Sequence, residues 1–141
     1  MSHRKTFVDA GVLIAAARGK DAEAAQAMRI LDDPNREFVS SPFLKLEILP
    51  KPIYEKRHAE VEFYQAFFDA VVHWADSVED ITRDAYVEAS KCGLSAMDAL
   101  HVAAAASAGA VDLITTEKAE KPIHRVNSVK VLSIHSAKNP K

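Results

Sequence analysis

The chain has 141 residues, a formal net charge of −2 and 48% hydrophobic residues. These values are typical of one compact soluble domain over residues 1–141, and they exclude disordered, collagen-like and low-complexity proteins. The nearly balanced charge argues against a protein that coats nucleic acid through bulk charge, although it leaves room for a nuclease.

Short apolar runs alternate with longer helical patterns along the chain. In chain order they predict a strand at 6–8, helices over 12–17 and 21–31, a strand at 37–40, helices over 43–49 and 54–74, a strand at 78–81, helices over 82–91 and 95–108, and strands at 111–115 and 129–132. Strands joined by helices of this length need crossover connections, which make neighbouring strands parallel. We therefore expect an α/β fold, a three-layer α/β/α sandwich with a mainly parallel central sheet.

The predicted helix over 54–74 holds much of the aromatic content of the chain. Its apolar positions cover much of its circumference, so the helix either packs in the core or offers a surface to another subunit. Core packing is the commoner outcome for aromatic residues at helical spacing. Contact with another subunit is the alternative use of this face.

The sequence gives no sign of membrane insertion or of a disulfide framework. No stretch approaches the ~20 consecutive apolar residues that a membrane span needs, and the first residues lack the apolar core of a signal peptide. We expect a cytoplasmic protein that does not contact a membrane. The single cysteine, Cys92, excludes an internal disulfide and is expected to be a small buried residue.

Four acidic residues lie where chemistry is expected. Asp9 directly follows the first predicted strand and Glu117 follows the fourth, so both belong to the carboxyl edge, where open parallel sheets bind ligands. Glu47 and Asp98 lie within apolar helical segments. Each acid also has a structural interpretation: Asp9 as a helix cap, Asp98 as a capping-box partner of Ser95, and the two glutamates as solvated side chains.

Together the four acids predict a metal site. Carboxylates gathered at one edge repel each other unless a cation neutralises them. Oxygen ligands suit Mg²⁺ or Mn²⁺, whose coordination is commonly completed by water and substrate phosphate. Such ions activate water and stabilise the leaving oxygen of a phosphodiester. The chemistry indicated is hydrolysis of a nucleic-acid backbone.

Four segments resemble, in order, the motifs of the PIN-domain family, and in particular the VapC-like ribonucleases of toxin–antitoxin systems. They are FVDAGVLI at 7–14, SSPFLKLE at 40–47, LSAMDALHVAAA at 94–105 and LITTE at 113–117. The third segment is the most specific, because it follows the family's acidic motif along its whole length. The resemblance spans almost the entire chain.

The resemblance implies a metal-dependent endoribonuclease that acts on RNA, uses Mg²⁺ or Mn²⁺, forms a homodimer and is inhibited by an antitoxin protein. The implied catalytic residues are Asp9, Glu47, Asp98 and Glu117. The implied metal ligands are Asp9, Asp98 and Glu47. The candidate substrate-binding residues are Thr115, Thr116 and Lys118, and either threonine could orient water.

Two residues depart from the family pattern. Gly11 stands where the family often has Asn, and Glu117 stands where it commonly has Asp. These departures motivate an alternative function, a PIN fold without catalysis that binds protein or RNA. A DNA nuclease on a related fold also stays open. A haloacid-dehalogenase-like phosphatase is set aside, because it requires a second Asp at position 11.

The remaining polar candidates carry weaker signals. His101 lies one helical turn beyond Asp98 and is expected in the core or at the rim of the site rather than as a proton donor. Cations that flank the acidic motifs are candidate phosphate-binding residues. They are Lys45, Lys118, Lys121 and Arg125.

Overall fold

The structure, a computed structural model, describes residues 3–135. Its elements are β1 (Arg4–Val8), α1 (Ala10–Arg18), α2 (Ala22–Leu31), β2 (Arg36–Ser40), α3 (Pro42–Ile48), α4 (Pro50–Tyr54), α5 (His58–Ala70), β3 (His73–Trp74), α6 (Val78–Cys92), α7 (Ala96–Ser107), β4 (Asp112–Thr115), a 3₁₀ turn η1 (Pro122–Arg125) and β5 (Lys130–Ser133). The order matches the sequence-based expectation except in the middle of the chain.

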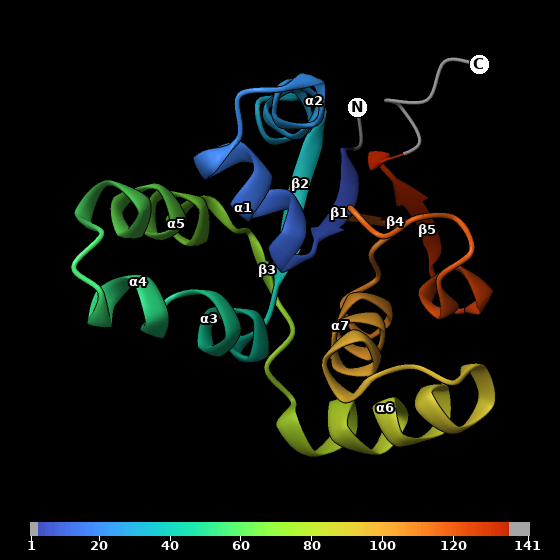
Figure 1. The fold of residues 1–141 in the computed structure, drawn as a ribbon. Helices are drawn as coiled ribbons and strands as arrows, with labels where there is room; N and C mark the ends of the chain where they lie inside the picture. The colour runs from blue at the N-terminus through green and yellow to red at the C-terminus, as the bar shows by residue number, and fades with distance from the viewer. Residues whose placement is uncertain (1–2, 136–141) are drawn as a thin grey trace.

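The five strands form one sheet in the order β3-β2-β1-β4-β5, and every neighbouring pair is parallel. Phe7 in the central strand pairs with Val39 on one side and Leu113 on the other. All strands therefore end at the same edge, and the segments that follow β1, β2 and β4 begin side by side (Figure 1). This edge is where a parallel sheet presents ligand-binding residues.

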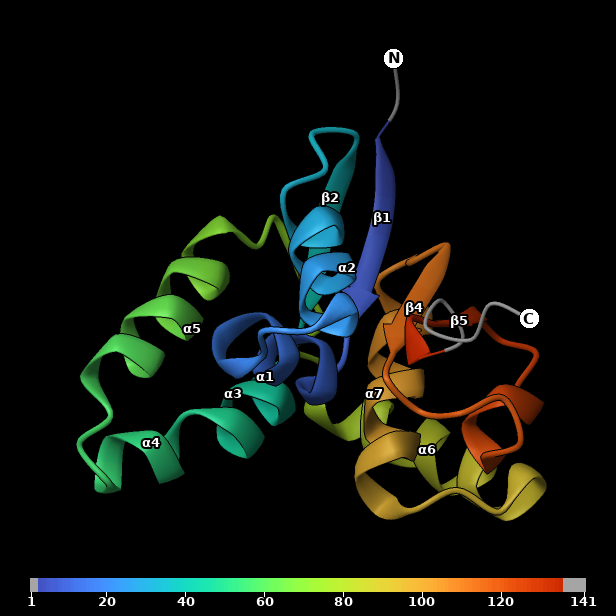
Figure 2. The ribbon, with the colours of Figure 1, turned by 45° about the horizontal axis from the view of Figure 1, so that its top comes forward.

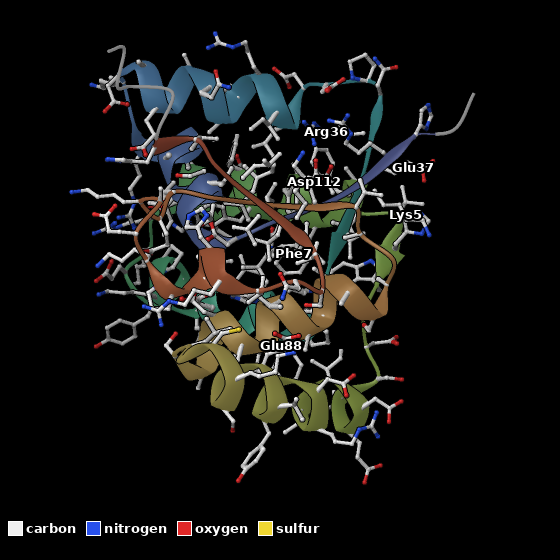
Figure 3. The ribbon with its side chains drawn as sticks, turned by 90° about the vertical axis from the view of Figure 1, so that its right-hand side faces the viewer. Lys5, Phe7, Arg36, Glu37, Glu88 and Asp112 are labelled. Atoms are coloured by element: carbon white, nitrogen blue, oxygen red, sulfur yellow. The ribbon has the colours of Figure 1, made fainter. Side chains whose placement is uncertain are left out.

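Helices cover both faces of the sheet, which confirms the predicted three-layer α/β/α fold. Helix α2 lies on one side of the sheet and α6 with α7 on the other (Figure 3). Helices α3, α4 and α5 form an arm on the β3 side of the molecule (Figures 1 and 2). Within residues 3–135, no helix is both long enough and apolar enough to cross a membrane.

The prediction of one helix over 54–74 is wrong. Helix α4 ends at Tyr54, and the chain reverses at Lys56, whose φ of 59° is left-handed, before α5 begins. After α5 the backbone becomes extended, and the Val72 N–H donates to the Phe38 carbonyl at 3.1 Å, which brings the chain into the sheet. The aromatic residues within α5 at positions 64, 67 and 68 are buried, so this part packs in the core.

The predicted strand at 78–81 is also wrong, because these residues form the first turn of α6. Glu79 and Asp80 lie in that turn, where acidic side chains interact favourably with the positive end of the helix dipole. The third strand is β3, which is only two residues long. A strand of that length has no alternating pattern that sequence analysis could detect.

A buried charged network fixes the opposite, amino-terminal edge of the sheet. Asp112 at the start of β4 is 3% exposed, accepts a hydrogen bond from Thr6 Oγ1 at 2.8 Å, and lies 3.3 Å from Arg36 Nη1. These three residues come from β4, β1 and β2, and Figure 3 labels Asp112 and Arg36. A shifted register would leave a buried charge without its partner, so the network favours the observed alignment of the strands.

Candidate active site

Asp9 is the innermost acid at the carboxyl edge. Its backbone N–H donates to the Ile114 carbonyl at 3.1 Å and continues the β1–β4 pairing by one residue. Its side chain caps α1, because Oδ1 accepts from the Val12 N–H at 3.3 Å. Only 7% of the residue is exposed, and this burial raises the pKa of the carboxyl to about 6, although the hydrogen bond from Thr115 opposes the rise.

Thr115 connects the Asp9 side chain to the loop that carries Glu117. Its hydroxyl donates to Asp9 Oδ2 at 2.5 Å and accepts from the Glu117 N–H at 3.1 Å. Thr115 is fully buried at the end of β4. The structure therefore places this candidate substrate-binding residue behind Asp9, where it orients both the acid and the loop after β4.

Asp98 approaches the same edge from α7. Its backbone N–H donates to Ser95 Oγ at 3.3 Å, so the expected helix cap is present. Its carboxyl is half-buried, and its pKa is raised by burial, then by Glu117 and to a smaller extent by Glu47. The negative charges of Glu117 and Glu47 therefore act on Asp98, and the charge of Asp98 in turn raises the pKa of Asp9 slightly.

Glu47 reaches the site from α3 and is paired with His101 of α7. Glu47 Oε1 lies 2.7 Å from His101 Nε2. His101 is 2% exposed, and its ring centroid is 5.4 Å from that of Phe7. His101 is thus buried, as expected, and its pairing with Glu47 is a contact for which the sequence carries no signal beyond the position of His101 one turn after Asp98.

The second ring nitrogen of His101, Nδ1, is buried without a hydrogen-bond partner among the residues that the structure describes. A neutral imidazole whose proton is on Nε2 donates to Glu47 and leaves only a lone pair unpaired. This tautomer is inferred from the surrounding hydrogen bonds. An unpaired buried N–H would cost more, so the geometry favours His101 as a donor that holds Glu47 in place.

The donor set suits a hard divalent cation, although it is not a closed cage. Within residues 3–135, no three Asp, Glu, His or Cys side chains are grouped closely enough to hold a metal ion by themselves. Mg²⁺ is commonly held by only one or two carboxylates, with water and substrate phosphates as its other ligands. Asp9 and Asp98 fit that arrangement, because burial already disfavours their ionised forms and a cation would relieve this cost.

The other polar candidates surround these acids in different ways. Thr116 is partly exposed and Lys118 exposed, so both are accessible on the loop after β4, as is Lys121. Arg125 donates from Nη1 to the Cys92 carbonyl at 3.1 Å and thereby stabilises the end of α6. Cys92 is buried, as the sequence predicted.

Gly11 accommodates the close approach of the Thr116 side chain. A Cβ atom at position 11 would lie 2.2 Å from Thr116 Oγ1 and 3.3 Å from Thr116 Cβ. The side chain of Thr116 therefore occupies the space that any side chain at position 11 would need. At this position the resembling family often has Asn. In this chain the Thr116 hydroxyl, from the loop after β4, approaches the start of α1 instead.

Comparison with known proteins identifies a family and a shared fold. The family model of the PIN domain matches residues 6–126. A similar solved structure is that of VapBC2 from Rickettsia felis bound to a DNA fragment from their promoter, with a TM-score of 0.66, 14% identity, and coverage of 92% of this chain and 98% of that chain. PAE2754 from Pyrobaculum aerophilum aligns with a TM-score of 0.50, 17% identity, and coverage of 97% and 95%. No curated protein sequence matches the chain.

Asp9→Asn is expected to stabilise the fold at neutral pH in the presence of EDTA. The folded pKa of about 6 exceeds the ordinary value of 3.8, so the stabilising contribution of protonated Asp9 is full below pH 3.8 and is lost as the pH rises through 6. Asn retains the helix cap without the buried charge. Urea unfolding at pH 7.5 should show a gain of up to about 3 kcal/mol that shrinks at pH 4.

The matched control is Asp84→Asn, which changes an exposed acid on α6. Its effect should stay within about 0.5 kcal/mol at both pH values. A loss of stability in Asp9→Asn at pH 7.5, with the same loss at pH 4, would show that the buried charge is not the dominant cost.

Gly11→Ala is expected to destabilise the protein, although alanine favours helices over glycine by about 1 kcal/mol. The clash with Thr116 should cost about 1–3 kcal/mol and exceed that gain. In a Thr116→Ala background the nearest atom is gone, so Gly11→Ala should become neutral or stabilising. Thermal unfolding of the four proteins measures this coupling, and equal effects in the two backgrounds would contradict the account.

Proposed function

The chain belongs to the PIN-domain family, and we propose that it is a metal-dependent endoribonuclease that hydrolyses RNA phosphodiester bonds as the toxin of a toxin–antitoxin pair. PIN domains are generally nucleases that use divalent metals. The observation that carries the proposal is the carboxyl group of Asp9, which is buried beside Asp98 with its pKa raised to about 6. Such a group is costly for the fold and is typical of functional sites.

The four acids would have different roles in this reaction. Asp9 and Asp98 are the proposed ligands of Mg²⁺ or Mn²⁺. Glu47 is held by His101, and the backbone N–H of Glu117 is held by Thr115. These two glutamates would orient water and accept protons beside the metal ligands Asp9 and Asp98. A bound divalent ion would supply neutralising charge and Lewis-acid activation of the attacking water.

The partly exposed Thr116 and the exposed Lys118 are the proposed contacts to substrate phosphate. The lysine places a positive charge directly beyond Glu117, which favours a phosphate approaching the acids. Thr115 is assigned the positioning of Asp9, because its buried hydroxyl already bonds to both sides of the site.

A second candidate function is a PIN fold that binds RNA or protein without cleaving it. The absence of a three-residue ligand group within residues 3–135 and the engagement of Glu47 by His101 favour this alternative. Metal-dependent stability distinguishes the two functions, because a non-catalytic module gains no stability from added Mn²⁺.

We propose two protein partners, an antitoxin and a second copy of the chain, in the cytoplasm. The solved Rickettsia felis structure contains VapBC2, which supports an antitoxin for this chain as well. Exposed apolar side chains on α3 and α4 provide a surface for such a contact. They are Leu46 at 72%, Ile53 at 52% and Tyr54 at 86% exposure.

The test is cleavage of a mixed-sequence RNA, with single-stranded DNA of the same sequence in parallel, in Mn²⁺, Mg²⁺ or EDTA. Wild-type protein should cleave RNA only with a divalent metal, and Asp98→Asn should reduce the rate by about 100-fold or more, because it removes a proposed ligand. Asp84→Asn serves as the matched control and should cleave at the wild-type rate.

Thermal unfolding supplies an independent readout of the same site. A metal concentration one hundred times the Kd should stabilise wild type by about 3 kcal/mol, and Asp98→Asn should lose most of this gain. No cleavage together with no metal-dependent change in Tm would contradict the nuclease and support the non-catalytic module.

A further inference from the structure

An aromatic and basic cluster lies at the β3 end of the sheet. Trp74, the last residue of β3, is 37% exposed, and its ring centroid lies 6.0 Å from that of Phe68 in α5. Lys45 of α3 places Nζ 5.7 Å from the Trp74 centroid and 5.8 Å from the Phe68 centroid. We name these three residues the Trp74 cluster. They come from β3, α5 and α3, which lie on the same side of the molecule (Figure 1).

The register of the strands places the Trp74 cluster beside the acids. Ser40 pairs with Trp74, and the β1–β2 register brings Val8 into the same row across the sheet. Asp9 is the next residue along β1. Because neighbouring strands are ~4.8 Å apart, the Trp74 backbone lies ~10 Å from that of Val8, at the same edge.

Helix α3 connects the two groups physically. Lys45 and Glu47 are two residues apart and therefore point in nearly opposite directions, about 200° around the helix. Glu47 contacts His101 in the acid site, whereas Lys45 contacts the rings of the Trp74 cluster. A ligand that extends along the carboxyl edge would thus meet the acids on one side of α3 and the cluster on the other.

Beside the cluster is a surface hollow of about 280 Å³ with mixed chemistry. Its lining residues are Lys45, Leu49, Gln65, Phe68 and Asp69. An amide, a carboxylate and an ammonium group thus stand next to an aromatic ring and an aliphatic side chain. A nucleobase matches this lining, because its faces are apolar and its edges carry hydrogen-bonding groups. An apolar protein side chain would make no hydrogen bonds to the polar groups of the hollow.

We propose that the Trp74 cluster binds one nucleotide of single-stranded RNA, with the base stacked on Trp74 and Lys45 paired with an adjacent phosphate. Stacking on an aromatic ring accepts any base, so the subsite anchors the strand without selecting its sequence. The flexible stem of Lys45 lets its ammonium group leave the rings for a phosphate. This inference rests on the proposed ribonuclease function, because the acid site would cleave the strand that the cluster holds.

Trp74 is the single tryptophan of the chain, so all tryptophan fluorescence comes from this cluster. A short mixed-sequence RNA is titrated into the Asp98→Asn protein, in which cleavage is expected to be slow, and binding is followed in parallel by the anisotropy of labelled RNA. We expect saturable quenching with the same midpoint as the anisotropy change. An abasic strand of equal length, which keeps the phosphates, should quench little.

Trp74→Ala should weaken RNA binding by about 5- to 100-fold, whereas Trp74→Phe should retain most of the affinity. Tyr86→Ala is the matched control, because Tyr86 is a 77% exposed aromatic residue on α6. In the wild-type acid background, Trp74→Ala should raise KM and leave kcat nearly unchanged. Lys45→Gln leaves β3 and the sheet unaltered, because Lys45 lies in α3. It should lower the salt dependence of RNA binding by about one phosphate contact.

The outcomes separate the subsite from the proposed function. RNA that is bound or cleaved without any change in Trp74 fluorescence, and equally well by Trp74→Ala, would overturn the subsite and leave the nuclease intact. RNA that is neither bound nor cleaved by wild type would overturn both. A fluorescence change that follows protein concentration and dimerisation without RNA would assign the cluster to a second copy of the chain, and would likewise overturn the RNA subsite.

Discussion

The buried carboxyl group of Asp9 is the interaction on which the carboxyl edge depends. It caps α1 through the Val12 N–H and accepts the hydroxyl of Thr115, so it connects the first helix to the fourth strand. Water is largely excluded, and the charged form is therefore costly. Asp98 adds negative charge beside it, and Glu117 adds negative charge beside Asp98. A divalent cation bound by these acids would relieve this accumulated cost.

Each of these residues combines an observed structural contact with a proposed chemical role. Asp9 is both a helix cap and the most perturbed acid, and the N–H of Asp98 completes a cap while its carboxyl remains available. Helix α3 also makes two different contacts: Glu47 is paired with His101, and Lys45 lies over the aromatic rings of Phe68 and Trp74. A short helix thus places opposite charges on the two sides of one edge.

Local patterns predict those parts of the structure that local interactions determine. The alternation of strands and helices is sufficient to predict the α/β/α fold, and the position of Asp9 and Glu117 after strands predicts that both lie at the carboxyl edge of the sheet. The pairing of Glu47 with His101 joins residues 54 positions apart, and the space filled by Thr116 is defined by a distant loop. Neither leaves a periodic signal, and the two-residue strand that exposes Trp74 is too short to have one.

The most direct measurement of the central claim is the pKa of Asp9 from the pH dependence of its carboxyl ¹³C shift, in EDTA and in saturating Mg²⁺. The account predicts a pKa of about 6 in EDTA, raised by burial, and a value well below that with Mg²⁺. In Asp98→Asn the effect of Mg²⁺ should be much smaller. The same pKa with and without Mg²⁺ in the wild-type protein would contradict a metal site built on Asp9.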